Sequence, residues 1–215
     1  MGRDNNRSCV LRVLSFWLFA AAPMCGAMTF DALWTADAHM VMEGAPMTVD
    51  LDGDGDAEVV TAAYENLIAF DGTGKELWRF DTRGRYSTCP AILERTGATP
   101  LIFAGDNTGQ FTCVDGKGNV VWQAETKPVF CASPALGDLN GDGAIEVVQG
   151  DKSGIVHVFD ALTGKPVWQT QIEGECSSPA LADLNGDGKL ETVIATTAGK
   201  VFALSATGEP IWEFA

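Results

Sequence analysis

The sequence is poor in the residues that most catalytic and nucleic-acid-binding sites use. It has only two histidines, His39 and His157, and it shows no Ser-His-Asp spacing, phosphate-binding glycine loop or zinc motif. Basic residues are also scarce: 14 Lys and Arg stand against 29 Asp and Glu, which gives a formal net charge of −15. Because nucleic-acid phosphates need a basic face, this balance argues against nucleic-acid binding. His157 lies within an alternating apolar segment, which favours a packing or solvent role over catalysis.

The sequence also lacks an apolar run long enough to span a bilayer. The run Val13 to Met24 is too short for a transmembrane helix, follows three arginines and precedes the small residues Cys25-Gly26-Ala27. This arrangement predicts a secretory signal peptide at residues 1–27 and no transmembrane span. We therefore expect an exported protein, located in the periplasm, outside the cell or at the cell surface. Lipidation at Cys25 and a buried first helix are the alternatives.

Four cysteines follow the expected signal peptide: Cys89, Cys113, Cys131 and Cys176. Export permits disulfides, and four cysteines allow three full pairings, between which the sequence does not choose. Cys131 and Cys176 both stand three residues before a proline. A bridge between neighbouring repeats and buried free thiols are therefore both open.

One unit repeats along the rest of the chain. Tryptophan recurs at positions 34, 78, 122, 168 and 212, and proline recurs at positions 46, 90, 134 and 179. A period in the forties, with short alternating apolar segments between Asp/Gly turns, is typical of one β-sheet blade per repeat. We predict an all-β protein, a β-propeller of four-stranded blades over residues 28–215, in which each tryptophan packs between neighbouring blades. The expected blades are about 45–88, 89–132, 133–177 and 178–215.

Trp34 has no blade before it in the sequence. The chain is therefore expected to contain four blades plus one extra N-terminal strand, as part of a larger propeller of six to eight blades. A four-bladed ring with a spare strand and an open arc that dimerises are the alternatives. An open arc would expose blade-sized apolar faces and favour pairing or aggregation.

Three of the four repeats carry an acidic loop between their first and second expected strands. The loops Asp50–Glu58, Asp138–Glu146 and Asp183–Glu191 have oxygen-bearing side chains at positions 1, 3, 5 and 9 and glycines at positions 4 and 6. Ca²⁺ prefers roughly 6–8 oxygen ligands, and glycine permits the tight backbone turn that such a loop needs. Position 7 would supply its carbonyl oxygen, as in an EF-hand, but the loop leads into a strand and not into a helix. The predicted Ca²⁺ ligands are Asp50, Asp52, Asp54, Asp56, Glu58, Asp138, Asn140, Asp142, Ala144, Glu146, Asp183, Asn185, Asp187, Lys189 and Glu191.

The alternative is that these loops are only solvated acidic turns, because Asp, Asn and Gly are common in turns. Mg²⁺ fits less well than Ca²⁺, because it demands a rigid octahedron and keeps its waters. The second repeat lacks the pattern and has Glu94, Thr96, Ala98 and Ile102 at the ligand positions. That blade is predicted to be metal-free, so Ca²⁺ would rigidify a loop and would not create the fold.

Two family resemblances follow from these motifs. The acidic loops followed by a strand resemble the FG-GAP (VCBS-like) repeats of integrin α-type propellers. The segment Asp160-x-x-Thr-Gly-Lys-x-x-Trp168 resembles the repeat of pyrroloquinoline-quinone (PQQ)-like propellers. Asp71–Trp78 and Asp115–Trp122 match with a shorter turn, and Ser205–Trp212 lacks the aspartate. Both resemblances imply a propeller, and neither specifies a function, because function belongs to the site and not to the fold.

The combined features favour a secreted or cell-surface calcium-binding propeller, peripheral to a cell surface, that acts as a binding or scaffold module for a protein or glycan. One alternative is the propeller portion of a calcium-dependent polysaccharide-active enzyme. PQQ-dependent dehydrogenases are similar in their tryptophan turn, but that resemblance implies a pair of adjacent cysteines, and the sequence has none. Another alternative is an outer-membrane assembly-type PQQ-like propeller, since the chain resembles that lipoprotein family. The family does not need calcium loops, so the three loops count against a close match.

Overall fold

The computed structural model describes residues 32–36, 44–129 and 132–215, so the expected signal peptide, His39 and Cys131 lie outside the described residues. These residues form sixteen strands in four antiparallel sheets. In each sheet the four strands lie side by side in chain order, and each sheet is called a blade below. This arrangement confirms the predicted all-β class with four-stranded blades. Within the described ranges no helix is long and apolar enough to cross a membrane.

Short turns join most consecutive strands within a blade, and in blades 1, 3 and 4 a longer connection joins the first strand to the second. Blade 1 contains β1 (Met47–Val49), β2 (Glu58–Ala63), β3 (Asn66–Phe70) and β4 (Glu76–Asp81). Blade 2 contains β5 (Ala91–Arg95), β6 (Ala98–Gly105), β7 (Gln110–Asp115) and β8 (Val120–Glu125). Blade 3 contains β9 (Ala135–Gly137), β10 (Glu146–Gly150), β11 (Ile155–Asp160) and β12 (Pro166–Gln171). Blade 4 contains β13 (Ala180–Ala182), β14 (Glu191–Ala195), β15 (Val201–Leu204) and β16 (Pro210–Phe214).

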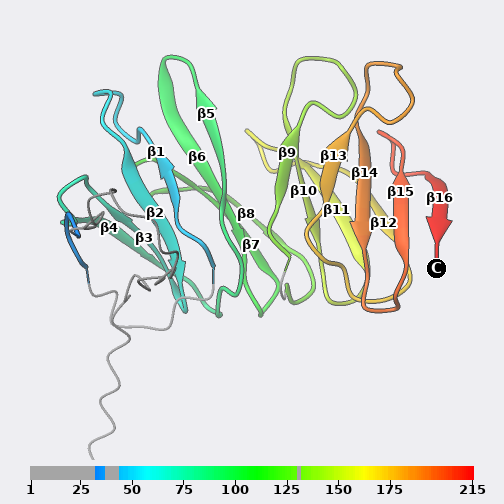
Figure 1. Ribbon diagram of the computed structural model, residues 1–215, viewed down its shortest axis with the longest axis horizontal. Coiled ribbons are helices and arrows are strands. Elements are labelled where there is room, and N and C mark those ends of the chain that lie inside the picture. The colour runs from blue at the N-terminus through cyan, green and yellow to red at the C-terminus, as the bar shows by residue number, and fades with distance from the viewer. Residues whose placement is uncertain (1–31, 37–43, 130–131) are drawn as a thin grey trace, which may run out of the picture.

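The blades stand next to one another in chain order, from blade 1 at the left of Figure 1 to blade 4 and the C-terminus at the right. Their first strands, β1, β5, β9 and β13, are neighbours in that order. The connections between first and second strands all lie along the top edge in Figure 1. The acidic loops of blades 1, 3 and 4 and the β5–β6 hairpin of blade 2 therefore share one edge of the molecule.

The hydrophobic core lies between the blades. Successive side chains of a strand point to opposite faces of its sheet, so an apolar strand can contact the blade before it and the blade after it. All five residues of β3 and all five residues of β10 are buried. Between blades 1 and 2, for example, Val60 and Leu67 pack in one cluster with Ile102 and Val114. Blade-to-blade contact is therefore the main source of hydrophobic stabilisation in this fold.

Three tryptophans connect each blade to the next, as the sequence predicts. Each indole Nε1–H donates a 2.9 Å hydrogen bond to a carbonyl oxygen in the next blade's turn between its third and fourth strands. Each ring also covers a glycine of that turn at positive φ, where a Cβ would lie 2.5 to 2.9 Å from the ring. The pairs are Trp78 with Gly116 O and Gly118, Trp122 with Ala161 O and Gly164, and Trp168 with Ala206 O and Gly208.

Trp34 lies against blade 1 in the same way. A Cβ on Gly74 would lie 2.6 Å from the Trp34 ring, and the ring centroids of Trp34 and Phe70 are 6.3 Å apart. Gly74 has a φ of 85° and occupies the turn between β3 and β4. The segment that contains Trp34 thus takes the place that the fourth strand of a preceding blade would take.

The described cysteines are free thiols. Cys113 and Cys176 are buried and Cys89 is partly buried. Burial raises the pKa of Cys113 to about 12 and the pKa of Cys176 to about 11. Because the thiolate is the reactive form, these two side chains act as packing groups. The open question of a bridge to Cys131 falls on a residue outside the described range.

Candidate metal centre

The three acidic loops are held by one pattern of hydrogen bonds. In each loop the aspartate at position 1 accepts N–H groups from both loop glycines, at 2.6 to 3.0 Å. These glycines have φ values between 79° and 95°, which L-residues adopt only with strain. The positive φ turns successive N–H groups toward one carboxylate, so the chain alone defines the shape of the loop. The aspartates at position 1 of the three loops are Asp50, Asp138 and Asp183.

The glutamate at position 9 ties the end of each loop to its beginning. One of its carboxylate oxygens accepts the backbone N–H of the leucine at position 2, at 2.8 Å in all three loops. Glu58, Glu146 and Glu191 are 5%, 3% and 2% exposed. This role as a buried tie was not visible in the sequence, where position 9 was predicted as a Ca²⁺ ligand; the ligand role stays a prediction. In two of the loops a glutamate oxygen also lies near loop side chains: Glu191 Oε1 accepts Asn185 Nδ2 at 3.3 Å, and an oxygen of Glu58 lies within 4.8 Å of oxygens of Asp50 and Asp52.

Positions 3 and 5 accept backbone N–H groups from two residues further along. The N–H of position 5 donates to the side chain at position 3, and the N–H of position 7 donates to the side chain at position 5. The residues at position 7 therefore contribute a backbone donor whatever their side chain, which agrees with their variety. The residues at position 7 are Asp56, Ala144 and Lys189. That their backbone carbonyl oxygens are Ca²⁺ ligands stays a prediction.

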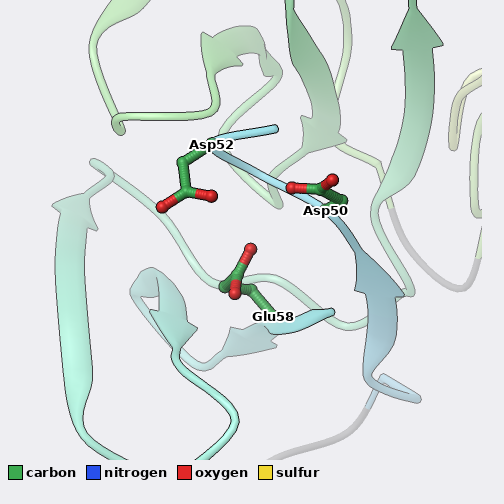
Figure 2. Close-up of side chains that lie close together, drawn as sticks. All are labelled: Asp50, Asp52 and Glu58. Atoms are coloured by element: carbon green, nitrogen blue, oxygen red, sulfur yellow. The ribbon is translucent and has the colours of Figure 1, made fainter. Parts of the chain in front are cut away.

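The loop of blade 1 brings three carboxylates together. Oxygen atoms of Asp50, Asp52 and Glu58 all lie within 4.8 Å of one another. Figure 2 shows the Glu58 carboxylate pointing toward the two aspartates. Such closely spaced like charges repel, and a hard divalent cation satisfies them together. The residues of this loop therefore fit Ca²⁺.

In the loops of blades 3 and 4, an asparagine amide stands between the carboxylates. Asn140 Nδ2 donates to Asp142 Oδ2 at 3.0 Å. Asn185 Nδ2 donates to Asp187 Oδ2 and to Glu191 Oε1, both at 3.3 Å. The Asn185 amide thus bridges two carboxylates of the blade 4 loop, whereas the Asn140 amide contacts one carboxylate of the blade 3 loop. To serve as a ligand, each asparagine has to turn its oxygen toward the ion, so these two loops fit Ca²⁺ less directly than the loop of blade 1.

The pKa of one carboxyl in the blade 3 loop and that of another in the blade 4 loop are shifted in opposite directions. Burial raises the pKa of Glu146, and the negative charges of Asp142, Asp138 and Asp160 raise it further. In contrast, backbone N–H groups of Gly188 and Gly186 lower the pKa of Asp183. The backbone of the blade 4 loop thus favours the ionised form of Asp183, whereas burial makes Glu146 of the blade 3 loop resist ionisation. A bound cation would remove that resistance.

Blade 2 replaces the acidic loop with a longer hairpin between β5 and β6. Arg95 closes it by donating from Nε and Nη2 to Thr99 O, at 2.9 and 2.5 Å. A groove of about 830 Å³ is lined by this hairpin and by Asp50, Asp52 and Gly53 of the neighbouring loop. The candidate metal loop of blade 1 therefore opens onto a groove that the metal-free blade completes.

A buried carboxylate–histidine pair was missed in the sequence. His157 Nε2 lies 2.8 Å from Asp151 Oδ2, and the two residues are 8% and 1% exposed. Burial raises the pKa of Asp151, but the hydrogen bonds from His157, Ile155 and Ser153 outweigh it and leave the pKa below the ordinary value. The enclosure of both side chains supports a structural role, in line with the packing role expected for His157.

The signal that could have identified this position is a repeated Asp-x-x-Gly turn between the second and third strands. It occurs as Asp106–Gly109 in blade 2 and as Asp151–Gly154 in blade 3. Asp106 is also buried, and it accepts a 2.7 Å hydrogen bond from Thr82 Oγ1 of the preceding connection. The same aspartate therefore joins neighbouring blades in both repeats.

A family model described as outer membrane protein assembly factor BamB matches residues 31–175 and 63–215 of this chain. A search of the curated proteins found no match. Among solved structures, BamB from Moraxella catarrhalis has a TM-score of 0.51 and 22% identity, over 85% of this chain and 64% of that chain. BBS1N in complex with ARL6DN, soaked with lead, has a TM-score of 0.59 and 12% identity, over 85% of this chain and 57% of that chain.

The same complex soaked with mercury has a TM-score of 0.54 and 13% identity, over 81% of this chain and 66% of that chain. At these identities the structural likenesses show the fold alone, and the fold they show is the β-propeller that the repeat predicts. This chain spans less than two thirds of the length of each of these structures.

Proposed function

Because the chain belongs to the family of outer membrane protein assembly factor BamB, we propose that it is an exported scaffold that binds a protein partner and whose loop edge is stiffened by Ca²⁺. The family description names protein assembly, which favours a protein partner over a glycan. The three acidic loops, which counted against this family in the sequence, occur here in chain segments that the family model matches. They are therefore compatible with the repeat and form an addition to it.

The hydrogen-bond pattern shared by the three loops carries the calcium proposal. An acidic turn that serves only for solubility does not need the same donor at each position in three separate blades. Here Asp50, Asp138 and Asp183 receive matching N–H donors, and the loop of blade 1 adds a cluster of three carboxylates. The ligand pattern that resembles FG-GAP repeats supports the same proposal. When bound, Ca²⁺ supplies positive charge that holds the loop oxygens together.

The proposed partner surface is the edge along which the loops and the β5–β6 hairpin lie (Figure 1). This edge contains the groove that Asp52 and Arg95 line, so acidic and basic residues both contribute to it. Loops supported on rigid sheets are common binding surfaces, because the sheets fix their position while the loop sequence varies. Calcium would order the edge before the partner binds and so reduce the entropy lost on binding.

Calorimetric titration of the EDTA-treated chain with CaCl₂ tests the metal sites. We expect binding with dissociation constants of about 10⁻⁴–10⁻³ M, typical of extracellular calcium modules, with the loop of blade 1 the tightest. Asp52→Ala should remove the tightest site. Glu94→Gln, in the blade without the loop, should leave all binding unchanged. The calcium proposal fails if the parent chain shows no binding heat.

Complementation tests the scaffold function separately. We expect the exported chain to raise outer-membrane protein levels in a bacterium that lacks its own member of this family. Quantitative blotting of the membrane fraction measures the effect, and protease resistance of the chain in cell envelopes reports that it is folded. A folded, exported chain that leaves those levels unchanged would contradict the assembly function, even if calcium binds.

A further inference from the structure

The edge opposite to the acidic loops is a continuous ridge of turns and blade connections. Because the strands of a blade are antiparallel, the turns between second and third strands lie along this lower edge in Figure 1. The connection after blade 1 is bonded to the turns on both sides. Thr82 N donates to Glu65 O at 2.9 Å, and Arg85 O accepts Asn107 N at 3.0 Å. We call residues 64–65, 82–86, 106–109, 126–129 and 151–154 the lower ridge.

The lower ridge is basic on a strongly acidic chain. It carries four basic residues and one exposed acid, Glu65, because its two aspartates, Asp106 and Asp151, are buried. The basic residues are Arg83, Arg85, Lys127 and Lys152. Asp81 and Glu125 flank the ridge, and Glu125 lies 4.0 Å from Arg83 in a pair whose side chains are 75% and 77% exposed. Such exposed pairs interact weakly, so among the described residues the ridge is a local excess of positive charge on a chain of net charge −15.

The repeat itself does not require this positive charge. The connection between blades 3 and 4 makes the same backbone contact, because Thr197 N donates to Glu175 O at 3.0 Å, as Asn107 N does to Arg85 O. The sequence at that connection is Glu173-Gly-Glu175, whereas the connection between blades 1 and 2 has Arg83-Gly-Arg85. The same backbone therefore accommodates either charge, and the fold alone does not explain the two arginines.

Tyr64 occupies a strained and exposed position at one end of the lower ridge. Its φ is 52°, and no other non-glycine residue among those described has a positive φ. The corresponding turns of blades 2 and 3 are two residues longer and place Gly109 and Gly154 at positive φ. Tyr64 is 37% exposed, so burial does little to offset its strain. The guanidinium carbon of Arg85 lies 5.2 Å from the centre of the Tyr64 ring and holds it in place. Such strain in a surface residue indicates a binding role.

We propose that the lower ridge binds an acidic, extended segment of a protein partner, with Tyr64 and Arg83 as the main contacts. Arg85 is a positioning residue that fixes the Tyr64 ring. Lys127 is two residues from Glu125, the neighbour of Arg83, so an extended segment can place one carboxylate at Arg83 and a later one at Lys127. This surface lies at the opposite edge from the acidic loops, and binding there does not require Ca²⁺.

A short acidic segment fits the lower ridge better than an anionic membrane does. At physiological salt, charges more than about 8 Å apart are largely screened, so a short segment responds mainly to the ridge itself. A membrane surface is an extended plane of negative charge, and it would also meet Asp81, Glu125 and the rest of an acidic molecule. Tyrosine and arginine are moreover enriched among the residues that dominate protein–protein interfaces.

Fluorescence anisotropy of a labelled poly-L-glutamate peptide, titrated with the full chain, tests the proposal. We expect saturable binding at about 0.15 M salt and its loss at about 1 M salt, where the Debye length is about 3 Å. A poly-L-glutamine peptide of the same length should not bind. The affinity should be equal in EDTA and in Ca²⁺, so a failure of this site is distinguishable from a failure of the calcium loops.

Three variants locate the binding on the lower ridge. Arg83→Ser should weaken peptide binding about twofold to fivefold, the range expected for one exposed charge pair. Lys117→Ser removes the same charge from a turn at the opposite edge and should leave the affinity unchanged. Tyr64→Asn should weaken binding about tenfold. The same substitution should raise the midpoint of thermal unfolding by up to about 4 °C, because asparagine tolerates positive φ better than tyrosine. A purely structural role for Tyr64 would not combine weaker binding with higher stability.

Three results would overturn the proposal. The first is that the folded chain does not bind the acidic peptide at about 0.15 M salt. The second is that Arg83→Ser and Lys117→Ser weaken binding equally, which would reduce the effect to the overall charge of the molecule. The third is that the chain binds vesicles of phosphatidylglycerol more tightly than the peptide, which would assign the lower ridge to a lipid surface.

Discussion

Blade 3 contains an acidic loop and two packed turns made from the same residue types. The acidic loop is Asp138–Glu146, and the packed turns are Asp151–Gly154 and Asp160–Gly164. In the turns, the first aspartate accepts hydrogen bonds from its own turn, such as Thr163 N to Asp160 Oδ1 at 2.7 Å. In the loop, Asp138 is bonded in the same way, but Asp142 remains exposed, and its two oxygens accept Ala144 N and Asn140 Nδ2.

The surroundings, and not the motif, separate the two regions. A Cβ on Gly164 would lie 2.5 Å from the Trp122 ring, whereas a Cβ on Gly143 would meet nothing within 4 Å. Both glycines have positive φ. The packed turns therefore hold neighbouring blades together, and the acidic loop is left free to change or to bind an ion. Asp and Gly density alone does not distinguish a blade contact from a candidate metal site.

Replacing the two glycines by alanine should show the largest difference between the regions. Gly164→Ala should lower the free energy of unfolding by about 2–4 kcal/mol, because the positive φ and the clash with Trp122 add. Gly143→Ala carries the backbone strain alone and should cost about 1–2 kcal/mol. Urea unfolding at neutral pH measures both. Equal losses would mean that the two regions do not differ in packing.

The packed turn at Asp151 should make stability depend on acid pH. Asp151→Asn should cost about 2 kcal/mol at pH 7, since a buried hydrogen bond to a charged group is lost. The folded-state pKa of Asp151 is lowered, so its contribution is complete above the ordinary value of 3.8 and is lost as the pH falls through the folded-state pKa. Denaturant unfolding between pH 7 and pH 3 should therefore show the two proteins converging. A difference that stays constant with pH would contradict this role.

Removing a carboxylate from each region should separate calcium-dependent from calcium-independent stability. Asp142→Ala, and likewise Asp187→Ala, should lower stability only when Ca²⁺ is present, by about 1–2 kcal/mol at millimolar concentration. Asp160→Ala, in a packed turn, should cost the same with Ca²⁺ and with EDTA. Thermal unfolding in both conditions measures this. If Asp142→Ala lowers the stability as much in EDTA as in Ca²⁺, Asp142 is not a Ca²⁺ ligand.

The smallest expected effect is at Glu146, where the stability change caused by a substitution should differ in sign between EDTA and Ca²⁺. The pKa of Glu146 is raised in the folded state, so ionisation of this buried carboxyl opposes folding. Stability therefore falls as the pH rises from 4.5, the ordinary pKa of a glutamate, through the folded-state pKa. In EDTA at pH 7, Glu146→Gln should be neutral or stabilising by up to about 1 kcal/mol, since glutamine can still accept the Leu139 N–H. In Ca²⁺ it should be destabilising. The same sign in both conditions would contradict a metal-bound Glu146.

The repeat made most of the fold predictable. The recurrence of Trp78, Trp122 and Trp168 and of the first-strand prolines indicates the blades, their strand order and the packing of each indole against the next blade. The acidic loops were equally visible. Their internal arrangement was less predictable, because position 3 has the pattern of a ligand whether it is Asp52 or an asparagine whose amide bridges two carboxylates, as Asn185 does.

Several features depend on contacts between repeats and left no clear signal. The hydrogen bond from Thr82 Oγ1 to Asp106 Oδ2 joins the connection after blade 1 to a turn of blade 2. The hydrogen bonds that link the residues before the prolines connect positions 44 or 45 residues apart. A sequence motif describes one blade at a time, whereas these contacts exist only when two blades meet.

The sequence by itself determined the period, the strand pattern and the places where glycine is required, because these follow from local backbone geometry and from the alternation of apolar side chains. Only the tertiary structure decided which apolar side chains of the repeat are buried by a neighbouring blade. Leu139 and Leu184 occupy the same position of the same motif, and one is buried while the other is half exposed, because a blade covers the first and none of the described residues covers the second. Burial is a property of the neighbour, and the local sequence does not encode whether the neighbour is there.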